Sequence, residues 1–210
     1  MPVSTESTSE RLDERVGRTV GQLQRRFLDQ DDSTARAELA RLRMAVDEAP
    51  GRTPQVWGMV LAATPDHLVG TKDEPTRGEQ TVHAALTLYA VHQQGNRRPM
   101  HVPDGRSFGT AAGILVRGRT PSTKARYDAL LMAGGDRNRA YHLRSLIGLL
   151  SADGVPLDYG RLAVDLHLIG TSHREGVQRR WGRDFYRAFT AQAPPPSSPP
   201  MTAVDLRHHH

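Results

Sequence analysis

The region 177–189 carries two sets of side chains whose spacing suits one helix. With about 100° between successive residues, the two sets fall on separate arcs of that helix. The apolar set is Val177, Trp181, Phe185 and Phe189. The cationic set is Arg179, Arg180, Arg183 and Arg187. Because guanidinium groups bind phosphate through paired hydrogen bonds, such a helix could pack on one side and hold polyphosphate on the other. The alternative is an ordinary solvated charged face.

The distribution of charge over the 210 residues also indicates a polyanionic partner. The chain has 28 basic and 23 acidic residues, a net charge of +5. Residues 1–80 hold 11 basic and 14 acidic residues (net −3), whereas residues 81–210 hold 17 and 9 (net +8). Only two of the basic residues are lysine, a bias that a GC-rich genome would also produce. A basic half of this kind most often contacts nucleic acid.

Residues for other chemistry are missing or have simpler explanations. The chain has no cysteine, so it has neither disulfides nor thiolate ligands. No histidines show zinc-protease spacing, and there is no phosphate-binding glycine loop or nucleophile elbow. Asp153, Asp158 and Asp165 are the carboxylates a nuclease would use in the basic half, and helix capping explains Asp158 better. We therefore expect no catalytic residues, no metal and no cofactor.

The sequence shows no segment for membrane insertion or export. Residues 1–10 are polar and lack the apolar run of a signal peptide. No stretch approaches the ~18 apolar residues of a membrane span. We expect a cytoplasmic protein that does not contact membranes.

Helical periodicity and capping residues predict an all-α protein of about nine helices in two packed helical bundles. Apolar residues recur at helical spacing in most segments, and no segment alternates as a half-buried strand does. Residues 66–75 are expected to form a loop, and the helix after Asp136 carries Tyr141 and Leu143 among its apolar residues. The expected helix starts are Asp32, Thr53-Pro54, Ser107, Thr120-Pro121, Asp136, Asp158 and Ser172.

Composition divides the chain into five parts. The region between Gly95 and Arg106 contains two prolines and is the expected boundary between two helical subdomains. We expect the proline-rich residues 191–210 to form a disordered tail, and we interpret the three final histidines as the remnant of a purification tag. The expected parts are an N-terminal arm with the first helix (1–32), an N-terminal subdomain (33–95), a linker (96–106), a C-terminal subdomain (107–190) and the tail (191–210).

Several strings in the chain together resemble the CasB family, the small subunit of the type I-E CRISPR surveillance complex called Cascade. The resemblance covers about residues 35–188. Its strings are Ala40-Arg41-Leu42-Arg43 with the later Trp57, Leu88 to Gln94, Ser107 to Ala111, Arg126 to Leu131, His142 to Ile147, Pro156 to Tyr159, Leu162 to Leu166 and Trp181 to Tyr186. Two departures concern arginines: Ala125 stands before Arg126 where relatives often have an arginine pair, and Thr110 occupies a position where they have arginine.

The resemblance implies an all-helical, non-catalytic protein present as two copies in the complex. Its expected partners are other Cascade subunits, a second copy of itself, the guide RNA and both strands of the target DNA. Such a subunit would hold nucleic-acid backbone without reading bases, and so stabilise the R-loop in antiviral defence. When a guide RNA opens DNA, the RNA–DNA duplex that forms is about as stable as the DNA duplex that it replaces. Modest contacts with the backbone can therefore shift the equilibrium toward the opened state.

On this reading, ten basic residues are the candidates for electrostatic contacts with nucleic acid. They are Arg41, Arg43, Arg97, Arg117, Arg119, Lys124, Arg126, Arg144, Arg179 and Arg180. Two alternatives remain open from the residues alone. The chain could be a helical protein–protein adaptor, with the arginines paired to acidic partners. It could also be a small sequence-specific DNA-binding regulator, with residues 134–150 as the nearest candidate for a recognition helix.

Overall fold

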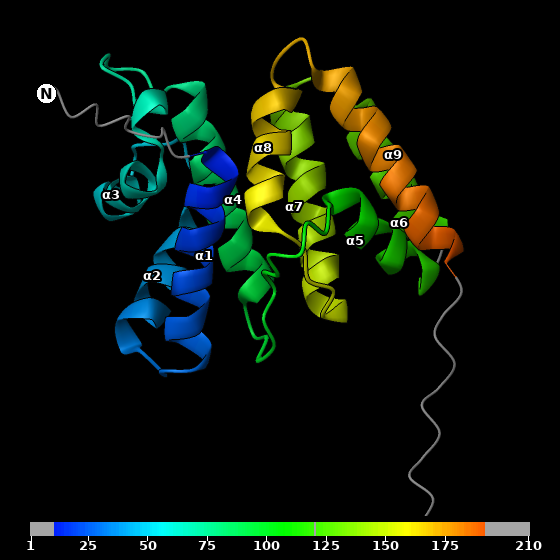
Figure 1. Ribbon diagram of the computed structural model, residues 1–210, viewed down its shortest axis with the longest axis horizontal. Coiled ribbons are helices and arrows are strands. Elements are labelled where there is room, and N and C mark those ends of the chain that lie inside the picture. Colours follow the sequence, from blue (N-terminus) through cyan, green and yellow to red (C-terminus); the bar gives the residue numbers. More distant parts are fainter. Residues whose placement is uncertain (1–10, 120, 192–210) are drawn as a thin grey trace, which may run out of the picture.

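The computed structural model describes residues 11–119 and 121–191, and the chain is all-α within these ranges, as the sequence predicts (Figure 1). The same ranges contain no strand, only an isolated bridge between His101 and Leu157. Residues 1–10 of the expected N-terminal part, Thr120, and residues 192–210 of the expected tail lie outside the described residues. Two short 3-10 helices occur, η1 (Ala45–Asp47) and η2 (Asp66–Leu68). The nine α-helices of the described ranges are α1 (Leu12–Leu28), α2 (Ser33–Met44), α3 (Pro54–Ala63), α4 (Arg77–Gln93), α5 (Phe108–Arg117), α6 (Pro121–Met132), α7 (Asp136–Asp153), α8 (Tyr159–Ile169) and α9 (Arg174–Thr190).

Side-chain caps define the starts of four helices. Asp32, Ser107 and Asp158 accept hydrogen bonds from backbone N–H groups in the first turns of α2, α5 and α8, at 2.7, 3.1 and 2.9 Å. Thr76 and Glu79 form a reciprocal capping box at α4. Each cap satisfies backbone donors that the helix itself leaves unpaired. The three aspartate and serine caps confirm the sequence prediction.

Two predicted caps were wrong, and one predicted loop is partly helical. Asp136 is the first helical residue of α7, and its carboxylate accepts a hydrogen bond of 3.0 Å from Arg139 one turn later. At α9 the residue before the helix is His173 rather than Ser172, and it provides no side-chain cap. Residues 66–75 begin with the single turn of η2.

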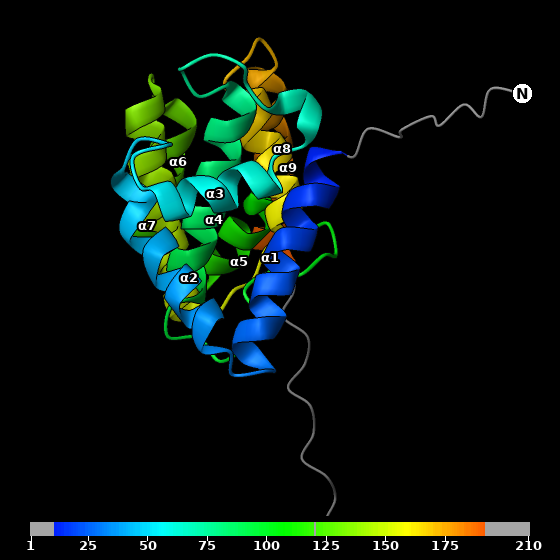
Figure 2. The same cartoon turned by 90° about the vertical axis from the view of Figure 1, so that its left-hand side faces the viewer.

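Helix α4 lies at the centre of the molecule, and 13 of its 17 residues are buried. One side of it packs against α1, α2 and α3, and the other packs against α7 and α8 (Figures 1 and 2). Beyond α7, helices α5, α6 and α9 form the far end of the molecule. Helix α1 also contacts α8, so the first helix bridges the two ends.

Glycines permit the closest helix crossings. A Cβ atom on Gly109 would lie 2.4 Å from the backbone oxygen of Trp181, and one on Gly113 would lie 2.5 Å from that of Phe185. Both contacts join α5 to α9. At the α1–α8 crossing, a Cβ atom on Gly160 would lie 2.4 Å from a backbone oxygen of α1. Backbone atoms cannot move aside as a flexible side chain can, so these crossings require glycine.

Residues 96–106, the predicted linker, pack between α1 and the start of α8. Met100 and His101 are buried, and the N–H of His101 donates to the side-chain oxygen of Gln24 at 2.8 Å. The N–H of Leu157 donates to the carbonyl of Met100 at 3.1 Å. A single hydrophobic cluster includes residues from all nine α-helices of the described ranges. The division into two subdomains at this segment stays a prediction.

The packing of α9 agrees with the predicted apolar arc on one side of this helix. Val177, Trp181 and Phe185 are buried, while Phe189 is 41% exposed at the end of the stripe. On α7 the sequence misplaces one aromatic residue, since Tyr141 is 71% exposed. It lines a cleft between α7 and α4, where its side chain is open to solvent.

Candidate nucleic-acid interface

The ten predicted basic residues are distributed over five helices and two connections. Five of them have a carboxylate within ion-pair distance, so the question is which are available to a ligand. They lie on α2 (Arg41, Arg43), after α4 (Arg97), at the end of α5 (Arg117) and just beyond it (Arg119), on α6 (Lys124, Arg126), on α7 (Arg144) and on α9 (Arg179, Arg180).

Arg41 and Arg43 occupy the last turn of α2. Arg41 is exposed and Arg43 is half-buried, and neither has a hydrogen-bond or ion-pair partner among the described residues. Cations in a last turn interact favourably with the helix dipole, which orients them without consuming their hydrogen-bond donors. Both guanidinium groups are therefore free to bind an external anion.

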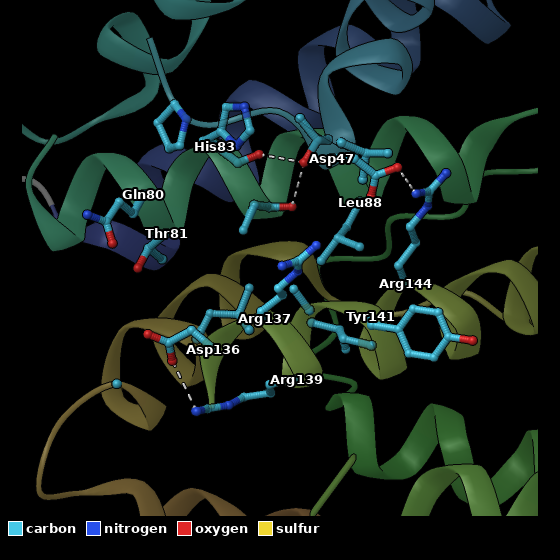
Figure 3. A pocket seen from close by; sticks show the side chains of 18 of the residues that line it. Asp47, Gln80, Thr81, His83, Leu88, Asp136, Arg137, Arg139, Tyr141 and Arg144 are labelled. Carbon is cyan, nitrogen blue, oxygen red and sulfur yellow. Dashed lines mark hydrogen bonds and ion pairs between the residues drawn. The ribbon is translucent and has the colours of Figure 1, made fainter. Parts of the chain in front are cut away.

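Arg144 connects α7 to the N-terminal part of the chain. Its Nη1 donates to Oδ2 of Asp47 in η1, across the cleft shown in Figure 3. The two side chains are 44% and 71% exposed. Asp47 follows Arg43 by four residues, so this pair places Arg144 beside the cationic end of α2.

Two basic residues of α6 face solvent. Nη1 of Arg126 donates to Oγ of Ser145 at 3.1 Å, which ties it to the turn of α7 that carries Arg144. Lys124 donates to Asp128 one turn later at 2.7 Å, and both side chains are 51% exposed. Exposed pairs of this kind contribute about 0–1 kcal/mol, so a phosphate can replace the carboxylate at little cost.

A second group lies at the C-terminal end of α7. Arg119 forms a two-pronged ion pair with Asp153, which raises the pKa of the arginine and lowers the pKa of the carboxyl. Arg97 is exposed and follows Asn96, whose amide donates to Ser151 on α7. These contacts bring Arg97 and Arg119 to the same end of α7.

The remaining residues belong to α9 and its end. Arg179 is exposed and donates to Glu175 one turn earlier at 3.1 Å. Arg117 donates to the carbonyl of Ala191, just after α9. Arg179 is thus available on the outer surface, and Arg117 lies at the C-terminal end of the same helix.

Arg180 has a structural environment that sets it apart from the others. Its Nη2 donates to Oδ1 of Asp165 at 2.7 Å, and Nε1 of Trp181 donates to Oδ2 at 2.6 Å. Asp165 is 3% exposed. A buried carboxylate needs such partners, so binding a ligand through Arg180 would leave that charge poorly compensated.

The structure therefore divides the predicted set into three groups. The largest runs from α2 across η1 and α7 to α6 and comprises Arg41, Arg43, Arg144 and Arg126, with Lys124 nearby. Sequence reasoning did not include Arg183 and Arg187 among the candidates, although they share the arc of Arg179. It also did not include Tyr186, which is 66% exposed. The sequence alone did not mark Tyr186, because its exposure follows from the way α9 packs.

A cleft of about 650 Å³ separates η1 and α4 from α7 and the end of α8 (Figure 3). Four arginines line it together with three acidic residues, so its charge is mixed. Arg139 is 8% exposed, burial lowers its pKa, and its Nε has no hydrogen-bond partner. The basic side chains lining the cleft are Arg77, Arg137, Arg139 and Arg144.

The three carboxylates that a nuclease would use have structural partners. Asp153 pairs with Arg119, Asp158 caps α8, and Asp165 is buried against α9. Across residues 11–119 and 121–191, no group of three or more histidines and carboxylates is arranged to hold a metal ion. In the same ranges no helix has both the length and the apolar character needed to cross a membrane.

Comparison with known proteins relates this framework to a CRISPR-associated family. Residues 38–186 match the family model described as CRISPR-associated protein Cse2. The crystal structure of CasB from Thermobifida fusca is 29% identical over 83% of this chain and 97% of its own, with a TM-score of 0.68. The crystal structure of M. ruber CasB is 28% identical over 72% of this chain and 84% of its own, with a TM-score of 0.55.

A chain of a structure titled CRISPR RNA-guided surveillance complex has the same fold. It is 22% identical over 85% of this chain and 94% of its own, with a TM-score of 0.56. No curated protein sequence matches the chain. Because the family model covers most of the chain and the two CasB structures resemble it in both sequence and fold, this protein belongs to the Cse2 (CasB) family of CRISPR-associated proteins.

Proposed function

We propose that this chain is a non-catalytic small subunit of a type I-E CRISPR RNA-guided surveillance complex, present there in two copies. Membership of the Cse2 family supports the proposal. The shared fold with a chain from an RNA-guided surveillance complex supports it further. Its partners would be the larger subunits, the guide RNA, both strands of the target DNA and a second copy of itself.

The role we infer is electrostatic clamping of nucleic-acid backbone. The observation that carries it is the group of arginines on α2, α6 and α7 that have no carboxylate partner or only an exposed one. Arg41 and Arg43 have no partner in the described ranges, and Arg126 bonds only a serine hydroxyl. Guanidinium groups so placed can bind phosphates without first breaking a stable internal pair.

Such a clamp would stabilise opened DNA regardless of sequence. The guide–target heteroduplex is about as stable as the DNA duplex it replaces, so added backbone contacts shift the balance toward the opened state. Each contact with phosphate also releases a counterion, which favours binding at low salt. No base readout and no bond-breaking step is required of this chain.

The direct test is reconstitution of the surveillance complex with a charge-reversed subunit. Arg41, Arg43 and Arg126 are changed together to glutamate. The matched control carries the same charge change at exposed sites outside the group: Arg25→Glu, Arg52→Glu and Lys72→Glu. Open target DNA is then measured by permanganate footprinting of unpaired thymines.

We expect the first variant to assemble into the complex but to accumulate less open DNA than wild type, while the control behaves as wild type. Equal opening by all three proteins would contradict the clamp. Purification of the chain from its native host should also recover guide RNA and larger subunits. Recovery of the chain alone would contradict the assignment to a complex.

A further inference from the structure

The outer face of α9 carries a cationic row that is interrupted by one aromatic residue and one glycine. The five residues are spaced three, one, three and one apart, so they share one face of the helix. They surround a shallow hollow on the surface. In Figure 1, α9 runs along the edge of the molecule, with α5 packed beneath it. The residues of this face, called here the α9 notch, are Arg179, Gly182, Arg183, Tyr186 and Arg187.

The arginines of the α9 notch are available to a ligand. Arg183 is exposed and has no hydrogen-bond or ion-pair partner among the described residues. Arg179 pairs only with the exposed Glu175. Arg187 lies 3.6 Å from Asp184, a carboxylate that also accepts hydrogen bonds from Ser107, the N-cap of α5, and from Arg161 on α8. Arg187 can therefore turn to a ligand without leaving that carboxylate unpaired.

Gly182 is not required by the packing of α9. A Cβ atom added to it would meet no atom within 4 Å, whereas one on Gly109 or Gly113 would strike the backbone of α9. Glycine in a helix interior is less favourable than alanine by about 1 kcal/mol. Because Gly182 has no side chain, the hollow is open at this position, and a ligand can approach the helix backbone closely.

Tyr186 supplies a flat surface beside this open position. It is 66% exposed, although a tyrosine ring normally buries much of its area. The arginines at 179, 183 and 187 recur every four residues, a rise of about 6 Å along the helix. This spacing is close to that of successive phosphates along an extended single strand.

We propose that the α9 notch binds single-stranded nucleic acid, with an unpaired base stacked on Tyr186 and the flanking phosphates held by Arg179, Arg183 and Arg187. A duplex hides the faces of its bases, so only an unpaired strand can use the tyrosine ring. A protein partner fits less well, because the hollow has no apolar side chain besides Tyr186. Helix α9 also has five arginines against two acidic residues. The inference rests on the proposed function and names the strand type that this face would bind.

The test compares two oligonucleotides of equal charge. One is a labelled oligothymidylate, and the other has the same length with abasic residues in place of thymidine. Affinities are measured by fluorescence anisotropy on the full chain at low salt. Wild type should prefer the oligothymidylate, and Tyr186→Leu should lose about tenfold on it but little on the abasic strand.

A second variant tests the hollow without removing any charge or ring. Gly182→Leu fills the hollow and should weaken oligothymidylate binding several-fold while thermal stability is unchanged or raised. Its matched control is Gly58→Leu on α3, a helix-interior glycine that also has open space around it. The control should bind as wild type. Photo-crosslinking of a 5-iodouracil strand should label Tyr186.

The outcomes separate this inference from the proposed function. If Tyr186→Leu and Gly182→Leu bind as wild type while reversal of Arg41, Arg43 and Arg126 weakens binding, the α9 notch is refuted and the clamp stands. If the variants keep their affinity for both strands but lose a co-purifying protein subunit, this face is a protein interface. If wild type binds neither strand even at low salt, both proposals fail.

Discussion

Nε1 of Trp181 donates a hydrogen bond of 2.6 Å to Oδ2 of Asp165, and this contact ties α9 to α8 in the interior. Arg180 neutralises the same carboxylate. Asp165→Ala should lower the free energy of unfolding by about 1–3 kcal/mol, because it leaves the buried indole N–H unpaired. Urea-induced unfolding measures the change. Arg183→Ala on the same helix should stay within about 0.5 kcal/mol of wild type, because that side chain has no partner in the described ranges. Equal losses in the two variants would show that the Asp165 contact adds nothing.

Substitution of glycine by alanine should have opposite effects on stability at the α5–α9 crossing and at an open position on α7. Gly109→Ala places a methyl group 2.4 Å from a backbone oxygen of α9 and should destabilise the protein by about 1–3 kcal/mol. Gly148→Ala, in the interior of α7 with open space around it, should stabilise by up to about 1 kcal/mol. Thermal unfolding of both variants checks this. A stabilised Gly109→Ala protein would mean that the helices do not cross this closely.

Stability should fall on acidification because of a buried histidine. His92 is fully buried against the hydroxyl of Tyr159, and burial lowers its pKa from 6.5 to about 4. Since the unfolded chain binds this proton more readily, the stabilisation is complete above pH 6.5 and is lost as the pH falls toward 4. The loss amounts to about 3 kcal/mol. Burial lowers the pKa of His83 and His101 as well, so their contributions have the same sign.

The comparison for this prediction is His92→Gln, which cannot titrate. Its free energy of unfolding should depend on pH less steeply than that of wild type between pH 6.5 and 4. Parallel curves for the two proteins would rule out His92 as the source of the acid sensitivity.

The ion pair between Arg144 and Asp47 predicts a gain of binding. Asp47→Asn removes the carboxylate that competes with phosphate for Arg144, so affinity for single-stranded DNA should rise about two- to fivefold at low salt. Because the pair is exposed, stability should change by less than about 0.5 kcal/mol. The control is Asp73→Asn, which makes the same charge change at an exposed site outside the group. An equal gain in affinity from Asp73→Asn would show that the effect comes from net charge and not from the Arg144–Asp47 pair.

Local sequence patterns predicted the helices because their signals lie within a few residues. Caps at Asp32, Ser107 and Asp158 and the apolar stripe of Val177 and Trp181 needed no knowledge of the fold. The availability of the arginines was not predictable in this way. Asp153 and Asp47 lie 34 and 97 residues from the arginines they pair with, and only packing brings them together.

The same limit applies to exposure. Tyr141 fits the apolar period of α7, yet it is exposed and lines the cleft between α7 and α4. Tyr186 and Gly182 carry no signal of their own, since both are compatible with an ordinary solvated helix face. Their grouping with three arginines becomes evident only when the packing of α9 shows which side faces out.

The salt dependence of binding to single-stranded DNA tests the electrostatic clamp most directly. On single strands, each phosphate contact contributes about −0.7 to the slope of log affinity against log salt. Changing Arg41, Arg43 and Arg126 to glutamate should weaken binding and flatten the slope by about 2, while helicity is unchanged. The control with Arg25, Arg52 and Lys72 reversed should keep the wild-type slope. Identical slopes for wild type and the Arg41, Arg43 and Arg126 variant would contradict the clamp.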